Sequence, residues 1–96
     1  MTDIYIDADA CPVKAEILQV AERHQLTIHI VSNQWMHIGN YPRINRIVVP
    51  TEPDAADDWI ANHIGPGDIA VTADILLARR CLKEGADLMG PTGRLF

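Results

Sequence analysis

Ile4-Tyr5-Ile6-Asp7-Ala8-Asp9 is the stretch that decides the fold of this chain. Its first part is rich in β-branched and aromatic side chains and predicts a buried strand over residues 3–7. Two carboxylates then follow at positions i and i+2, although burying an unpaired carboxylate is costly. In open α/β sheets, ligands bind at the carboxyl ends of the strands. The stretch therefore predicts a strand whose end presents Asp7 and Asp9 to a ligand.

A second apolar run, Ile69-Ala70-Val71-Thr72-Ala73-Asp74, ends in an acid in the same way. Between and around the two runs, apolar segments alternate with segments of helical period. Proline near the start of the first helix, a Gly-Pro-Gly stop after the second, and Asp74 and Gly85 around the third mark the boundaries. We expect strands at 3–7, 26–31, 44–49, 68–73 and 86–89, helices at about 11–24, 54–64 and 75–84, and an irregular loop at 33–43.

This order of elements predicts an α/β fold: a three-layer parallel sheet of four to five strands with helices on both faces. Fold type favours the strand order 3-2-1-4-5, in which the first and fourth strands are neighbours at the switch point. Asp7 and Asp74 would then meet at the crevice where such sheets bind ligands. With 96 residues, we expect one domain over 1–96.

A third acidic group lies at Asp54, Asp57 and Asp58 in the expected second helix. Asp57 precedes the apolar stripe that contains Ile60, so it should point inward. Like charges three or four residues apart destabilise a helix by roughly 0.2–0.5 kcal/mol per pair, and a divalent cation would offset that cost. Oxygen ligands suit Mg²⁺ or Mn²⁺. Helix capping and the helix dipole offer a purely structural explanation for the helix acids.

The candidate site consists of four acids and three flanking residues. We expect Asp7, Asp57 and Asp74 to hold a Mg²⁺ or Mn²⁺ ion. The catalytic set adds Asp9, and the candidate substrate contacts are Lys14, Asn33 and Thr72. A bound metal could activate water and stabilise a phosphodiester transition state.

Composition narrows the class of protein. Hydrophobic residues make up 48% of the chain, which is too many for a disordered segment. The net charge of −5 argues against a generic electrostatic nucleic-acid binder, although not against an enzyme whose metal offsets the acids. Without a signal peptide, a membrane-length apolar run or a disulfide pattern in the two cysteines, we expect a reduced, cytoplasmic protein.

Several blocks of the sequence closely resemble those of the uncharacterised bacterial YaiI/YqxD family. The most specific block runs from Tyr5 to Pro12 (YIDADACP), and the others are residues 31–34 (VSNQ), 54–57 (DAAD) and 71–78 (VTADILLA). The resemblance covers nearly the whole chain. It implies a PIN-like domain, which is a metal-dependent nuclease fold, and hence hydrolysis of RNA in preference to DNA, or of another phosphodiester.

By position, the resemblance assigns the conserved PIN acids to Asp7, Asp57 and Asp74. Two departures stand beside it. The fourth acid of the PIN set has no counterpart, because Asp87 should begin a strand. Family members also continue past a block like Pro91 to Arg94, so we expect this chain to lack a C-terminal part present in relatives, and to self-associate through the C-terminal edge of its sheet.

Two other classes of function remain open. In a haloacid-dehalogenase-like phosphatase, Asp7 would be the nucleophile and Asp9 the general acid. However, the chain has no lysine between Asn33 and Asp68 to complete that family's third motif. In a non-catalytic interaction module, Trp35, Met36 and Tyr41 of the long loop would contact a partner protein. An inactive acid cluster would then give no metal-linked stabilisation.

Overall fold

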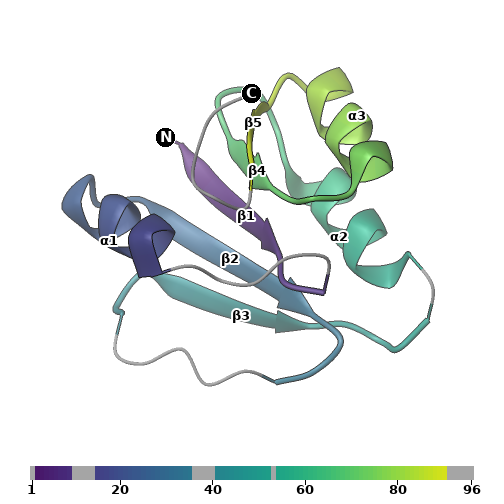
Figure 1. Cartoon of the computed structure of the whole chain (residues 1–96), viewed down its shortest axis with the longest axis horizontal. Helices are drawn as coiled ribbons and strands as arrows, with labels where there is room; N and C mark the ends of the chain where they lie inside the picture. Colours follow the sequence, from purple (N-terminus) through teal and green to yellow (C-terminus); the bar gives the residue numbers. More distant parts are fainter. Residues whose placement is uncertain (1, 10–14, 36–40, 53, 91–96) are drawn as a thin grey trace.

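The computed structural model is a three-layer α/β sandwich and describes residues 2–9, 15–35, 41–52 and 54–90. Its sheet contains the strands β1 (Asp3–Asp7), β2 (Thr27–Ser32), β3 (Ile44–Val48), β4 (Ile69–Val71) and β5 (Asp87–Met89). All neighbouring strands pair in parallel, in the order β3-β2-β1-β4-β5 (Figure 1). The predicted fold class and strand order are both confirmed.

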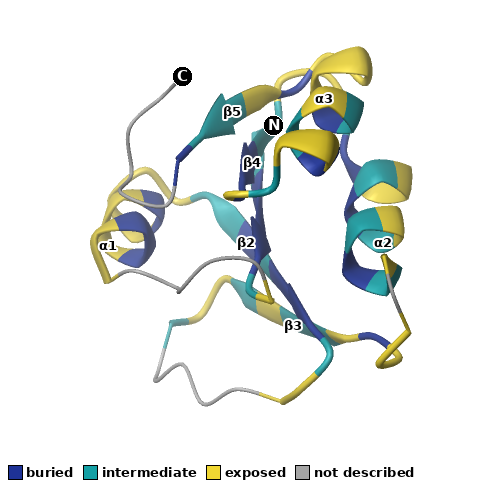
Figure 2. Cartoon of the chain, turned by 45° about the vertical axis from the view of Figure 1, so that its right-hand side comes forward, coloured by how far each residue is buried: buried dark blue, intermediate teal, exposed yellow. Residues whose placement is uncertain are grey.

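In the described residues, three helices cover the two faces of the sheet. These are α1 (Ala15–Arg23), α2 (Ala55–His63) and α3 (Ile75–Lys83). Figure 2 shows α1 on one side of the sheet and α2 with α3 on the other, each turning its buried residues inward. The expected start of the first helix lies outside the described residues, and the strand expected at 68–73 is shorter, because the backbone leaves the ladder after Val71.

The period of two along β1 divides the core between the faces. Ile4 and Ile6 pack with Ile17 and Leu18 of α1. Tyr5 points the other way and packs with the residues of α2 and α3. Asp7 lies two residues after Tyr5, so it shares the face that α2 and α3 cover. This alternation brings the acid at the end of β1 to the helices that carry the other acids.

The residues on either side of α3 explain where this helix begins and where it ends. Asp74 caps the helix by accepting hydrogen bonds from the backbone N–H groups of Leu76 at 2.8 Å and Leu77 at 3.4 Å. After the helix, Gly85 has a φ of +84°, which non-glycine residues rarely adopt. A Cβ at Gly85 would make only ordinary contact with Pro66, at 3.4 Å, so the backbone conformation is what requires glycine here.

Candidate functional site: an acidic cleft at the carboxyl edge of the sheet

A cleft of about 360 Å³ opens where β1 ends and α2 and α3 begin. Because helices in parallel sheets run opposite to the strands, the amino ends of α2 and α3 meet the carboxyl ends of β1 and β4 here. Oxygen-bearing side chains dominate the lining, which comprises Asp7, Asp9, Asn33, Thr51, Glu52, Asp54, Ala55, Ala56, Asp57 and Asp74.

Asp7 is the most deeply buried residue of the cleft lining. Only 1% of the residue is exposed, and its Oδ2 accepts a hydrogen bond from the hydroxyl of Thr72 at 3.0 Å. The same Thr72 oxygen accepts a hydrogen bond from the backbone N–H of Asp74 at 3.0 Å. One hydroxyl therefore ties the end of β1 to the start of α3. Thr72, predicted as a substrate contact, is itself 97% buried (3% exposed) and contacts Asp7.

Asp57 shows how strongly the acids crowd one another. Burial, followed by repulsion from Asp7, Asp74 and Asp54, raises the pKa of Asp57 to about 6, while the guanidinium of Arg80 lowers it. The side chain is half-buried in the first turn of α2, three residues before the buried Ile60 of the core-facing stripe. The sequence prediction that Asp57 points inward is consistent with this position.

Helix capping explains the position of Asp74 but not that of Asp54. Asp74 is a capping residue as well as a cleft residue, so its carboxylate has two possible tasks. Asp54 occupies the capping position of α2 but makes no side-chain capping bond, because its backbone is in the left-handed region with a φ of 64°. A capping residue normally has an extended backbone that turns its side chain toward the helix N–H groups.

Asp9 joins two loops at the rim of the cleft. Its carboxylate accepts hydrogen bonds from the Ser32 hydroxyl at 2.8 Å and from the backbone N–H of Asn33 at 3.1 and 3.0 Å. Asp9 thus connects the segment after β1 to the segment after β2. Both carboxylate oxygens serve this connection, whatever further role the residue has.

The structure brings most of the predicted site residues to one place. Asp7, Asp9, Asp57, Asp74 and Asn33 all line the cleft, and Thr72 lies behind Asp7. Lys14 falls outside the described residues.

Sequence reasoning missed two polar lining residues, Thr51 and Glu52, and it named Asp54 in the acidic group without assigning it to the site. The argument that singled out Asp7 could have found them, since they follow the third strand at the same edge of the sheet.

The arrangement does not yet form a metal centre. Within the described ranges, no group of three His, Cys, Asp or Glu side chains is placed so that it could hold a metal ion. The donor chemistry suits a hard cation, because the cleft offers carboxylates. Coordination would therefore require the side chains to move closer together than they stand here.

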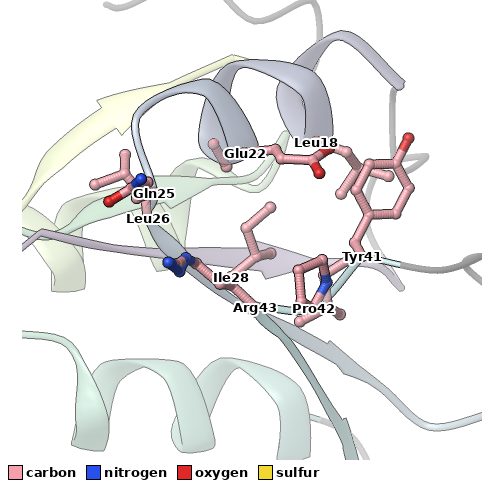
Figure 3. Close-up of a pocket in the computed structure, with 10 residues that line it drawn as sticks. Leu18, Glu22, Gln25, Leu26, Ile28, Tyr41, Pro42 and Arg43 are labelled. Atoms are coloured by element: carbon pink, nitrogen blue, oxygen red, sulfur yellow. The ribbon is translucent and has the colours of Figure 1, made fainter.

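A second hollow lies at the opposite edge of the sheet, below α1 (Figure 3). Its volume is about 190 Å³, and its apolar lining includes Leu18 of α1 and Ile28 and Ile44 of the sheet. Glu22 and Arg43 are the charged residues of its lining. An apolar hollow of this kind lacks the concentration of like charges that makes the cleft the candidate site.

No helix in the described part of the chain is long and apolar enough to span a bilayer. No solved structure is significantly similar to this chain.

Comparison with known proteins identifies relatives over the full length of the chain. A UPF0178 protein of Rhodospirillum rubrum is 59% identical over 95 residues, which cover 98% of this chain and 63% of the relative. UPF0178 proteins of Parvibaculum lavamentivorans and Azorhizobium caulinodans are 57% and 59% identical, and this chain covers 63% and 57% of their lengths. The chain thus spans about three-fifths of the length of these curated relatives. The family model described as "Uncharacterized BCR, YaiI/YqxD family" matches residues 5–96. This chain belongs to the YaiI/YqxD family.

Proposed function

We propose that this protein is a metal-dependent phosphodiester hydrolase, a nuclease that acts on RNA in preference to DNA. The reaction takes place in the acidic cleft at the carboxyl ends of β1 and β4. The family is uncharacterised, so the proposal comes from the cleft and from the resemblance of its acids to those of PIN-like nucleases.

One observation carries the proposal: Asp7, Asp57 and Asp74 come from three different elements and share one cleft. Their mutual repulsion contributes to the raised pKa of Asp57. Crowded carboxylates that destabilise one another persist at functional sites, where perturbed ionisation serves chemistry or ligand binding. A structural role is available to Asp74, which caps α3, and to Asp57, which lies in the first turn of α2, but capping and the helix dipole do not explain Asp7 at the end of β1.

A Mg²⁺ or Mn²⁺ ion is the ligand that this charge pattern favours, because oxygen donors select hard cations. Asp7, Asp57 and Asp74 would hold it after their side chains draw together. Bound there, the cation would supply positive charge that offsets the carboxylates and the charge that develops on the phosphoryl oxygens.

The protein's own residues prepare the site for hydrolysis. Thr72 orients Asp7 through the 3.0 Å hydrogen bond, and Asp9 holds the loop that places Asn33 at the rim. In the reaction, a water oxygen bonds to phosphorus while a P–O ester bond breaks. The water then gives up one proton, and the departing oxygen ends with one. Carboxylates beside the attacked phosphorus are suited to accept that proton from water.

The direct test is cleavage of a fluorescently labelled single-stranded RNA with Mg²⁺ or Mn²⁺. We expect cleavage by the wild type, loss of at least about a hundredfold in rate for Asp7→Asn, and an unchanged rate for Asp87→Asn. Asp87 is a matched control, because it is an exposed acid at the start of β5, away from the cleft. Equal rates for wild type and Asp7→Asn would contradict the proposal.

A structure of the purified protein with a phosphoryl mimic distinguishes a nuclease from a phosphatase. A phosphatase of the haloacid-dehalogenase type would form a phosphoryl adduct on Asp7, whereas hydrolysis by water leaves Asp7 unmodified. We expect no density bonded to Asp7 in a structure determined with a fluoride-based phosphoryl mimic. Such density would replace the nuclease proposal with the phosphatase.

A further inference from the structure

The solvent-facing side of α3 is apolar, whereas a surface helix normally presents polar residues there. Ile75 is 70% exposed, Leu76 is 69% exposed and Leu82 is 54% exposed. Leu77 and Cys81 hold the opposite side of the helix in the core, and Figure 2 shows that side turned toward the sheet. Most of the surface of the three exposed aliphatic side chains is therefore in contact with water, although its burial would be favourable.

Two cations share this side of the helix. Arg79 and Lys83 are exposed, and neither has an ion-pair partner among the described residues, whereas Arg80 is bonded to Asp58 at 2.8 Å. The helix itself contains no acid. We call its five exposed residues, Ile75, Leu76, Arg79, Leu82 and Lys83, the α3 face. The α3 face is thus positive on a chain whose net charge is −5.

Aliphatic and positive side chains alternate along the α3 face. Ile75 and Leu76 lie in the first turn, and Arg79 lies about one turn later. Leu82 lies beside Lys83 at about two turns, or roughly 10 Å along the axis from Ile75. Residues three and four apart form the ridges by which helices pack on one another. A helix that fits this ridge would place aliphatic side chains about two turns apart and acidic side chains between them.

Charge distinguishes the kinds of surface that could cover the α3 face. A second copy in an antiparallel pair of α3 helices would bring Arg79 against the same residue of the other copy, because residue 79 is at the middle of the helix. A broad polyanion, such as an anionic bilayer or a nucleic acid, would also meet the exposed Asp58 of the neighbouring α2, which would repel it. A single helix is narrow enough to contact α3 alone, and acidic side chains on it would pair with Arg79 and Lys83.

We propose that the α3 face docks an amphipathic helix of another protein, whose acidic side chains pair with Arg79 and Lys83 and whose aliphatic side chains cover the exposed aliphatic residues of that face. Burial of the aliphatic side chains supplies the affinity, and the ion pairs fix the orientation of the docked helix. The docking surface adjoins the acidic cleft, since Ile75 directly follows the cleft residue Asp74. It is a separate property of the chain, which does not depend on hydrolysis in the cleft.

Fluorescence anisotropy with labelled synthetic peptides measures this docking. The acidic peptide is an alanine-based helix that carries, on one side, leucines two turns apart with glutamates between them. A basic peptide has lysines in place of the glutamates, and an apolar-deficient peptide has alanines in place of the leucines. We expect saturable binding of the acidic peptide by the wild type, and a Kd at least about tenfold higher for each of the other two peptides.

Substitutions assign the binding to the α3 face. Leu76→Ser should raise the Kd for the acidic peptide at least about fivefold, because serine removes apolar area that the peptide buries. Val20→Ser is the matched control, since Val20 is an aliphatic residue 42% exposed on α1, across the sheet, and it should leave that Kd unchanged. The double variant Arg79→Glu/Lys83→Glu should reverse the preference, so that it binds the basic peptide more tightly than the acidic one. Binding of the basic peptide also shows that the double variant is folded.

Several outcomes would overturn the inference. These are no binding of the acidic peptide, equal Kd values for wild type and Leu76→Ser, or an unchanged preference of the double variant for the acidic peptide. If the wild type sediments with phosphatidylserine vesicles and Leu76→Ser does not, the α3 face binds a membrane and the inference is wrong. It is also wrong if light scattering shows that Leu76→Ser converts a dimer into a monomer, because the face then binds a second copy.

Discussion

The ionisation of Asp57 is altered by burial and by the acids that crowd the cleft. Its pKa is raised to about 6 from an ordinary value of 3.8, chiefly by burial and then by the neighbouring acids. The folded protein therefore binds this proton more tightly than the unfolded chain does. It follows that the free energy of unfolding falls as the pH rises from about 4 to about 6, and stays lower above that range.

The first prediction is that Asp57→Asn removes this loss in the metal-free protein. The variant should gain stability relative to the wild type between pH 4 and pH 7, by on the order of 1 kcal/mol once solvent screening of this partly exposed group is allowed for. Urea denaturation at pH 4, 5.5 and 7 measures it, with Asp87→Asn as the control. Parallel profiles of the free energy of unfolding against pH for wild type and Asp57→Asn would show that the charged Asp57 carboxylate does not destabilise the fold.

The second prediction concerns the hydroxyl that orients Asp7. Thr72→Val keeps the shape of the side chain and removes the hydrogen bond to a residue that is 1% exposed, so it should lower the free energy of unfolding by about 1 to 3 kcal/mol. Thr72→Ser should restore most of that loss and should also restore RNA cleavage. Similar stability in the valine and serine variants would mean that the hydroxyl has no orienting role.

At the scale of the elements, the sequence predicted where the acids converge but not how they are held. Alternation along β1 follows from the local pattern, whereas the order of the strands is inferred from the fold type. Together these place Asp7 near α2 and α3. The bonds from Ser32 and Asn33 to Asp9 join residues 23 and 24 positions apart, and no local pattern encodes such a pairing. The cation–π contact of Arg46 with Trp35 was not predicted for the same reason, since it joins a loop to β3.

Backbone conformation also limited what the sequence could show. Asp54 stands where a capping residue is expected, yet its φ of 64° turns it out of the capping geometry. Aspartate tolerates the left-handed region better than most residues, so the sequence alone allows both conformations. Asp74, in contrast, has an extended backbone and caps α3 as predicted.

The third prediction separates the two tasks of Asp74, the helix cap and the cleft acid. Asp74→Asn keeps a good capping side chain and removes the charge, so the free energy of unfolding should change little while RNA cleavage is lost. Asp74→Ala should lose both, with a stability cost of roughly 0.5–2 kcal/mol for the missing cap. Urea denaturation and the cleavage assay together decide it. Full cleavage by Asp74→Asn would reduce this residue to a cap.

At the scale of the whole molecule, β5 lies at one edge of the sheet in the part of the chain that the structure describes. The N–H of Asp87 donates to the carbonyl of Asp68 at 2.8 Å, on the β4 side. Amides alternate in direction along a strand, so the N–H of Leu88 faces the outer side. An outward-facing row of backbone groups is a template for pairing with another strand.

The fourth prediction is that this edge associates with a second copy. Light scattering over a concentration series should show growing mass, and the Leu88 amide should exchange hydrogen more slowly at high concentration than at low concentration. Asp87, an exposed acid on the same strand, makes the association weaker at low salt, because like charges then meet. A constant monomer mass with concentration-independent exchange at Leu88 would contradict the prediction.

The central claim is that Asp7, Asp57 and Asp74 act together on one divalent cation. The most direct measurement is a crystal structure of the protein soaked with Mn²⁺, in which anomalous scattering locates the metal. We predict one strong peak within about 2 Å of carboxylate oxygens from all three residues, the coordination distance of a small hard cation. Absence of a peak in the cleft, or a peak that touches only exposed acids such as Asp87, would contradict the claim.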